Sequence, residues 1–103
     1  MIHINIHQLE NSITKIQVKG HANYAQHGED LVCAGVSSIM IGLLNALDEY
    51  KKDVDMSVNE GFIEILVNDI KDKDLQLMLQ VALIQLKTME ESYSNYIGIE
   101  KEV

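Results

Sequence analysis

Two side chains that could perform acyl-transfer chemistry lie close together in this sequence. Cys33 is the only cysteine in 103 residues, and His21, one of four histidines, stands twelve positions before it. A cysteine thiolate is a strong nucleophile, and a neighbouring imidazole can act as its base. His21 and Cys33 are therefore candidates for a catalytic pair, provided that the fold brings them together.

The residues around Cys33 fit such a role. With Asp30 as the N-cap of a helix, Cys33 stands third in that helix, among unpaired backbone N–H groups that favour a thiolate. Asp30 could cap the helix, orient His21, or do both. Ser37 lies one helical turn after Cys33 and shares its face. Gly35 exposes backbone beside the cysteine and could allow a substrate chain to approach closely.

Structural roles must be weighed against these. A lone cysteine at an apolar helix start is more often a small buried hydrophobic residue, and spacing alone favours that interpretation. His21, His27, Cys33 and Asp30 could instead bind a transition metal, but no C-x-x-C or H-x₃-H core supports this. A thiol-based redox sensor would need a second, resolving cysteine, which this sequence does not have. The residues predict no metal and no cofactor.

Alternating patterns predict an N-terminal hairpin. Residues 1–7 place isoleucines on one face and His3 and His7 on the other. A polar turn at residues 10–12 leads to a second strand, 13–19, in which Thr14, Ile16 and Val18 share a face. Two such strands joined by a short turn form an antiparallel hairpin.

The next segment combines a loop with a strongly apolar helix. Residues 22–29 have neither periodicity nor a hydrophobic run, and they predict a mobile loop without apolar anchors. A helix follows from about Asp30 to about Lys51, and its apolar residues surround most of it. Such a helix must be covered on more than one side, by a sheet and by a second helix or a partner subunit.

The second half repeats the layout. Strands are predicted at 54–58 and 62–67 around the turn Asn59–Gly61. A second helix begins at Asp69 or Asp72 and runs to about Ser92. Leu77, Val81 and Ile84 are expected to widen its apolar stripe. Residues 96–100 predict a short final strand.

The order ββαββα(β) indicates one α+β domain over residues 1–103, with two layers. Hairpins dominate, so the sheet should be mostly antiparallel, with both helices packed on one face.

The composition argues against some classes of partner and location. The net charge is −8, and all eight basic residues are lysines, which argues against direct nucleic-acid binding. The longest uncharged run, 31–47, has 17 residues, fewer than the ~20 that a membrane-spanning helix needs. A single cysteine cannot form an internal disulfide, and together with the lack of a signal-peptide pattern it favours the cytoplasm.

The motif resembles a known family. Gly20-His21-Ala22, then Gly28 and Asp30, then Val32-Cys33-Ala34 and Val36-Ser37 are similar to the signature of the Prp family. These are bacterial ribosomal-processing cysteine proteases, and the resemblance extends over the whole chain. Many members have alanine where this chain has Gly35.

The resemblance implies a function. Family members remove an N-terminal extension from ribosomal protein twenty-seven of the large subunit, cutting after an aromatic residue, and they are homodimers. By motif, Cys33 is the nucleophile and His21 the base, with Gly20, Gly28, Asp30 and Ser37 in supporting positions. Backbone N–H groups at the helix start, including that of Cys33, would stabilise the oxyanion. The loop 22–29 would close over the substrate.

A function of a different class is also open. The chain could be a non-catalytic ribosome-assembly or regulatory module that binds the same ribosomal-protein segment. In that case binding would survive the loss of both Cys33 and His21.

Overall fold

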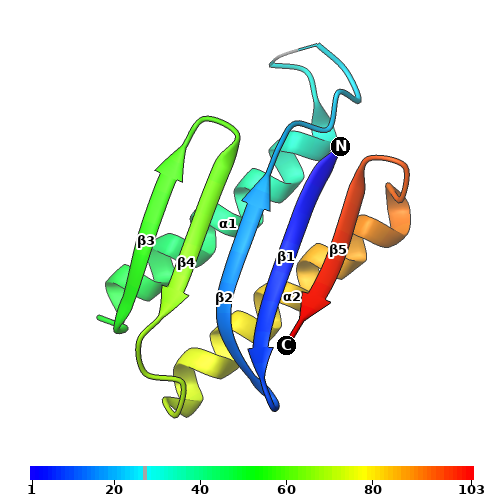
Figure 1. The fold of residues 1–103 in the computed structure, drawn as a ribbon. Coiled ribbons are helices and arrows are strands. Elements are labelled where there is room, and N and C mark those ends of the chain that lie inside the picture. The colour runs from blue at the N-terminus through cyan, green and yellow to red at the C-terminus, as the bar shows by residue number, and fades with distance from the viewer. Residues whose placement is uncertain (27) are drawn as a thin grey trace.

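The structure, a computed structural model, describes residues 1–26 and 28–103. Within them, a five-stranded sheet is covered on one face by two helices (Figure 1). The elements in chain order are β1 (Ile2–Leu9), β2 (Ser12–Lys19), α1 (Leu31–Glu49), β3 (Val54–Asn59), β4 (Phe62–Val67), α2 (Lys73–Ser92) and β5 (Ile97–Glu102). The predicted two-layer α+β fold is confirmed.

The strand order in the sheet is β3-β4-β2-β1-β5. The β1–β2, β2–β4 and β3–β4 pairs are antiparallel, and the pair of β1 with β5 is parallel. The short final strand predicted from the sequence therefore exists, and it lies beside the first strand. The backbone N–H of Ile2 donates to the carbonyl of Tyr96 over 2.8 Å, so the start of β1 is joined to the start of β5.

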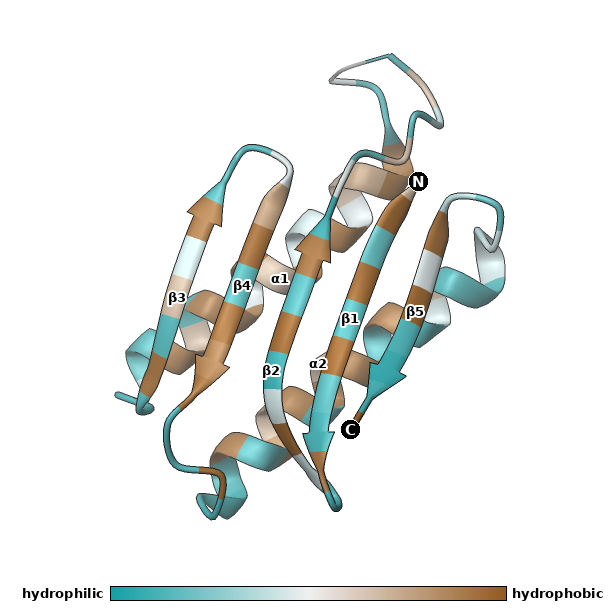
Figure 2. Ribbon diagram, viewed as in Figure 1, coloured by the Kyte–Doolittle hydropathy of each residue, from teal (hydrophilic) through white to brown (hydrophobic). Residues whose placement is uncertain are grey.

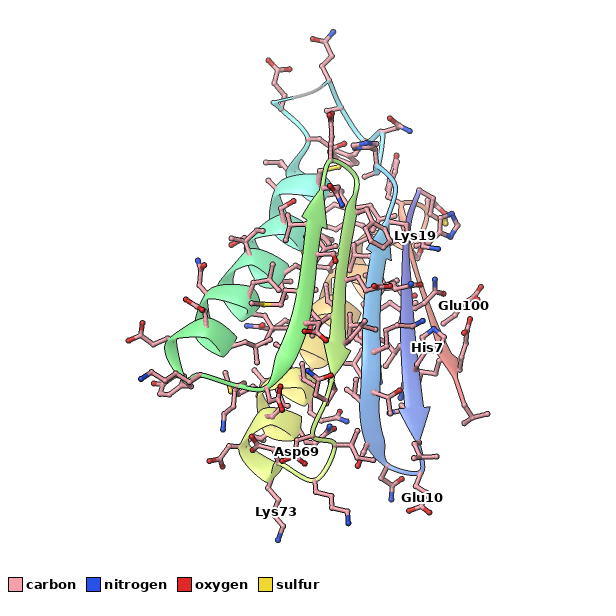
Figure 3. The ribbon with its side chains drawn as sticks, turned by 60° about the vertical axis from the view of Figure 1, so that its left-hand side comes forward. His7, Glu10, Lys19, Asp69, Lys73 and Glu100 are labelled. Atoms are coloured by element: carbon pink, nitrogen blue, oxygen red, sulfur yellow. The ribbon has the colours of Figure 1, made fainter. Side chains whose placement is uncertain are left out.

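The core lies between the sheet and the helices. Ile2, Ile4 and Ile6 of β1 are buried there, and the hydropathy of β1 alternates accordingly (Figure 2). His7, Lys19 and Glu100 lie on the opposite face of the sheet, which neither α1 nor α2 covers (Figure 3). The alternation of apolar and polar residues thus decides which face of the sheet the helices cover.

One strand departs from the expected alternation. The register between β1 and β2 shifts at His7 and Gln8, and this irregularity places Ile13 as well as Ile16 in the core with no exposed surface. Thr14 is half-buried instead of sharing the core face with Ile16. The sequence pattern alone cannot locate such a bulge, because the extra residue shifts the faces by one position.

Helix α1 is a core helix. Its buried residues follow helical spacing: Val32, Val36, Met40, Leu43, Leu44 and Leu47. By length and composition alone α1 is apolar enough to cross a membrane, but the core helix of a folded domain passes the same test. Asp30 is its N-cap, as predicted.

Helix α2 has Asp72, one of the two predicted residues, as its N-cap. Leu75, Leu79, Ala82, Leu83 and Leu86 form its buried face. The expectation that Leu77, Val81 and Ile84 widen this face is wrong, since they are 63%, 49% and 61% exposed. They lie on the exposed side of the helix, where Leu77 and Val81 line a groove beside α1.

Candidate active site

The predicted site residues gather at one end of the molecule. There β2 ends, α1 begins and the β3–β4 hairpin turns, far from the β1–β2 turn that holds Glu10 (Figures 1 and 3). A cavity of about 650 Å³ opens at this end. All six residues predicted from the motif line it: Gly20, His21, Gly28, Asp30, Cys33 and Ser37.

Gly20 turns the chain out of the sheet. Its φ is +95°, and a Cβ there would lie 2.6 Å from the Met1 carbonyl oxygen. Both observations require glycine, because L-residues avoid this φ and the space is occupied by backbone. The Gly20 N–H donates to the Gly61 carbonyl over 2.9 Å. The first residue of the motif thus directs His21 toward the β3–β4 turn.

The imidazole of His21 lies against Gly61. A Cβ built on Gly61 would be 2.9 Å from the Nε2 atom of His21. The His21 side chain is exposed at the wall of the cavity. Among the hydrogen bonds of residues 1–26 and 28–103, none joins His21 to the Cys33 thiol. Catalytic hydrogen bonds often tighten only when substrate is bound.

Cys33 is the third residue of α1, as predicted, and is half-buried. Its sulfur accepts a hydrogen bond from the backbone N–H of Ala22 over 3.3 Å. Ala22 directly follows His21 in the sequence, so the fold brings the backbone of the histidine segment against the cysteine sulfur.

The carboxylate of Asp30 joins the helix start to the loop. One oxygen, Oδ1, accepts the N–H groups of Val32 and Cys33, each over 3.0 Å. The other, Oδ2, accepts those of Tyr24 over 2.9 Å and Ala25 over 3.4 Å. The Cys33 N–H, followed by those of Tyr24 and Ala25, holds the pKa of Asp30 below its ordinary value, and burial opposes this in part.

This bonding corrects the expected oxyanion site. The N–H groups of Val32 and Cys33 already donate to the Asp30 carboxylate, and that of Ala34 donates to the Asp30 carbonyl. They are therefore not free for a substrate oxyanion in this conformation. The backbone N–H directed at the sulfur is instead that of Ala22. Asp30 caps the helix and ties the loop, and its hydrogen bonds include none to His21.

The expectation of a loop without apolar anchors is wrong for its first half. The Tyr24 ring packs edge-to-face on Tyr93 and Tyr96, with ring centroids 5.7 Å and 5.1 Å apart. Tyr93 caps the end of α2, and Tyr96 immediately precedes β5. We call these three residues the tyrosine cluster. It fastens the loop to a part of the chain about seventy residues away, which the local composition of the loop does not reveal.

Gly35 does not border the cavity. An ideal Cβ on it would lie 2.5 Å from Cε and 3.1 Å from Sδ of Met89, so this glycine makes room for a side chain of α2. The expected close approach of a substrate chain at Gly35 is therefore wrong. Gly28 has a φ of +89° and open space around it, so only its backbone conformation favours glycine at this position. Ser37 lines the cavity on the same face as Cys33.

Metal ligation finds no support in the described part of the chain. Among those residues, no group of three or more His, Cys, Asp or Glu side chains is arranged to hold a metal ion. His27, one of the four candidate ligands, lies outside the described residues.

Sequence reasoning missed three contributors to the site. Gly61 was expected only as a turn residue, Ala22 had no assigned role, and Tyr24 was part of an unanchored loop. The positions of Gly61 and Tyr24 depend on contacts with distant segments, which no local pattern signals. Ala22 is the third residue of the Gly-His-Ala motif, so the motif itself was its signal.

Comparison with known proteins decides the family. Residues 1–98 match the family described as cysteine protease Prp. The chain belongs to the Prp family. It is therefore a cysteine protease, and the resemblance read from the motif is confirmed.

Individual Prp relatives agree over most of their length. The ribosomal processing cysteine protease Prp of Staphylococcus aureus is 35% identical over 93 residues, which are 87% of this chain and 88% of that protein. The Bacillus subtilis protein of the same name is 28% identical over 101 residues, 91% and 90% of the two chains.

Solved Prp structures confirm the fold. The crystal structure of S. aureus Prp with a covalently linked product peptide superposes with a TM-score of 0.94, at 31% identity over 99% of this chain and 100% of that one. The same protease with a substrate peptide gives a TM-score of 0.88 at 29% identity and the same coverage.

Proposed function

We propose that this chain is a ribosomal processing endopeptidase in which Cys33 is the nucleophile and His21 the general base. Its substrate would be the N-terminal extension of ribosomal protein twenty-seven of the large subunit, cut after an aromatic residue. The names of the relatives and the peptide complexes of S. aureus Prp support a ribosomal-protein peptide as substrate. The observation that carries the dyad is the contact of the cysteine sulfur with the backbone beside His21, at the wall of one cavity.

The cavity supports the preference for a large apolar side chain. Away from the dyad, its lining is dominated by apolar residues from the sheet and from α1: Ile2, Val18, Val36, Ile41, Val58, Phe62 and Ile63. A volume of about 650 Å³ lies in the range of ligand pockets and is large enough for several residues of a peptide. Burial of an aromatic ring against these side chains would supply binding energy next to the scissile bond.

In the first half-reaction, His21 takes the proton of the Cys33 thiol, the resulting thiolate attacks the carbonyl carbon, and a carbon–sulfur bond forms. The peptide carbon–nitrogen bond then breaks, and His21 gives its proton to the leaving amine. In the second half-reaction, His21 takes a proton from water. The hydroxide attacks the thioester carbon, the carbon–sulfur bond breaks, and the product acid and the thiolate are released.

The Ala22 N–H has a defined place in this scheme. It donates to the Cys33 sulfur before reaction, and the oxyanion develops two bonds away from the same sulfur, on the oxygen of the attacked carbonyl. Donors that are already fixed near the developing charge lower the barrier most effectively, because they need no rearrangement.

The test is cleavage of a peptide that spans the extension and the start of the mature ribosomal protein, followed by mass spectrometry. Cys33→Ala should abolish cleavage, and His21→Ala should lower kcat by about 10²–10⁴-fold, the usual contribution of a general base. Asn45→Ala, an exposed change on the same helix outside the cavity lining, is the matched control and should keep wild-type activity. Cleavage that persists in Cys33→Ala would refute the assignment.

The expected assembly and location belong to the same proposal. The chain would act as a homodimer in the cytoplasm, without binding nucleic acid directly or entering a membrane. A groove of about 510 Å³ between α1 and α2 supports a homodimer. Most of the residues that line it are apolar, and a second copy of the chain could cover them.

A further inference from the structure

The general base needs a fixed position, and the turn of the β3–β4 hairpin adjoins its ring. We propose that Gly61 is a positioning residue: its lack of a side chain is what allows the His21 imidazole to occupy its place beside the cavity. This inference rests on the proposed role of His21 as the base. Gly61 itself contributes no group that takes part in the reaction.

The contact involves the whole edge of the ring. An ideal Cβ on Gly61 would lie 2.9 Å from Nε2, 3.4 Å from Cε1 and 3.7 Å from Cδ2 of His21. Real Cβ atoms almost never approach a heavy atom within 3.0 Å. The smallest side chain at position 61 would therefore compete with the imidazole for the same space.

The backbone around Gly61 is fixed independently of this contact. Strand pairing sets Lys19 opposite Phe62, and the Gly20 N–H donates to the Gly61 carbonyl over 2.9 Å. His21 follows directly from this bond, so its Cα position is tied to the hairpin. Gly61 also has a φ of +69°, which L-residues other than asparagine and aspartate rarely adopt.

A substitution at Gly61 should move the ring and not the fold. Nε2 is the far end of a side chain with rotatable bonds, and His21 is exposed, so the imidazole can swing away. The hydrogen bonds of the sheet need not change. The consequence is a displaced base in a folded protein, and a displacement of about 1 Å can cost on the order of 10²-fold in rate.

Two variants separate the ring contact from the backbone conformation. Gly61→Ala adds a Cβ and strains the positive φ, whereas Gly61→Asn adds a Cβ in a residue that tolerates this φ. If the ring contact matters, both variants lower kcat for the extension peptide by roughly 10- to 100-fold. KM changes little, because the apolar walls of the cavity are intact. The thermal midpoint of Gly61→Asn stays near that of the wild type.

A spectroscopic readout reports on the ring directly. The Cε1–H resonance of His21, assigned by comparison with His21→Ala, should shift in Gly61→Asn. In the His21→Ala background, Gly61→Asn should cause no further loss of residual activity, because the two residues act through one position.

The outcomes are distinct. A wild-type kcat and an unmoved His21 resonance in Gly61→Asn, with His21→Ala inactive, would overturn the positioning role and leave the proposed dyad standing. Full activity in His21→Ala would overturn the proposed base and this inference together. A loss of kcat that adds to that of His21→Ala would also contradict the positioning role, because Gly61 would then act by another route.

Discussion

At the scale of single residues, Asp30 links the two segments that form the site. Its carboxylate accepts four backbone N–H groups, two from the start of α1 and two from the loop after His21. A neutral amide offers a single acceptor oxygen. Asparagine at this position can therefore cap the helix or hold the loop, but it cannot do both as the carboxylate does.

The first prediction concerns pH. Asp30→Asn should unfold at a lower temperature than the wild type, and the difference should be constant above about pH 4, near the ordinary pKa of an aspartate. Because hydrogen bonds hold the pKa of Asp30 lower in the folded state, the folded protein binds fewer protons than the unfolded one. The stability that Asp30 contributes should then disappear as the pH falls through its lowered folded pKa. Thermal unfolding at a series of pH values measures this.

Asp72→Asn is the matched control. Asp72 caps α2, and the Leu75 N–H, followed by the Lys52 ammonium, holds its pKa below the ordinary value as well. Its replacement should give the same acid dependence of stability with an unchanged kcat, because α2 begins at the end of the molecule away from the cavity. Asp30→Asn should also lose activity. Equal activities of the two variants would contradict the role given to Asp30.

At the scale of elements, the tyrosine cluster joins the loop after β2 to the connection between α2 and β5. Edge-to-face aromatic pairs contribute about 0.5–1.5 kcal/mol each beyond simple burial. The Tyr24 ring makes two such pairs, and the backbone N–H of the same residue donates to the Asp30 carboxylate. The cluster therefore fixes the backbone that brings the Ala22 N–H to the cysteine sulfur.

The second prediction follows from this contact. Tyr24→Ala should slow both peptide cleavage and the alkylation of Cys33 by iodoacetamide, because the Ala22 N–H is released from the sulfur. Tyr24→Phe keeps the ring and should retain both rates. Tyr50→Ala, at the far end of α1 and 69% exposed, controls for the loss of a surface tyrosine. Equal alkylation rates in the wild type and Tyr24→Ala would show that the cluster does not hold the site.

The elements could be predicted from sequence, whereas several contacts between them could not. Periodicity and capping signals located both helices, all five strands and the Asp30 cap, since these depend on neighbours a few residues away. The bulge in β2, the packing of Met89 on Gly35 and the tyrosine cluster depend on distant segments. For the site, the motif indicated which residues gather, but the spacing of His21 and Cys33 could not show that Ala22 and Gly61 contact them.

At the scale of the whole molecule, one face of the helix layer remains apolar. The groove between α1 and α2 is lined by Ile39, Leu43, Leu77, Met78 and Val81, among others. Leu77 and Val81 are well exposed. Burying this surface against a second copy would remove apolar area from water, as happens in the interfaces of homodimers.

The third prediction tests this assembly. Val81→Glu should convert a dimer into a monomer in sedimentation equilibrium, because an unpaired carboxylate would be buried in the apolar contact. Asn11→Glu, an exposed change in the β1–β2 turn, adds the same charge elsewhere and should leave the dimer intact. A wild-type protein that sediments as a single chain would contradict the homodimer, and a dimer that survives Val81→Glu would exclude this face.

The pairing of β5 with β1 has a consequence for folding during synthesis on the ribosome. β5 leaves the ribosome long after its partner β1, and Tyr93 and Tyr96 emerge just before it. The pairing of β1 with β5 cannot begin until β5 has been made, because the long loop between them must close before their contacts can form. A nascent chain that already carries Cys33 and His21 therefore lacks the partners that fasten Tyr24. The candidate site is complete only after the segment that carries Tyr93, Tyr96 and β5 has been made.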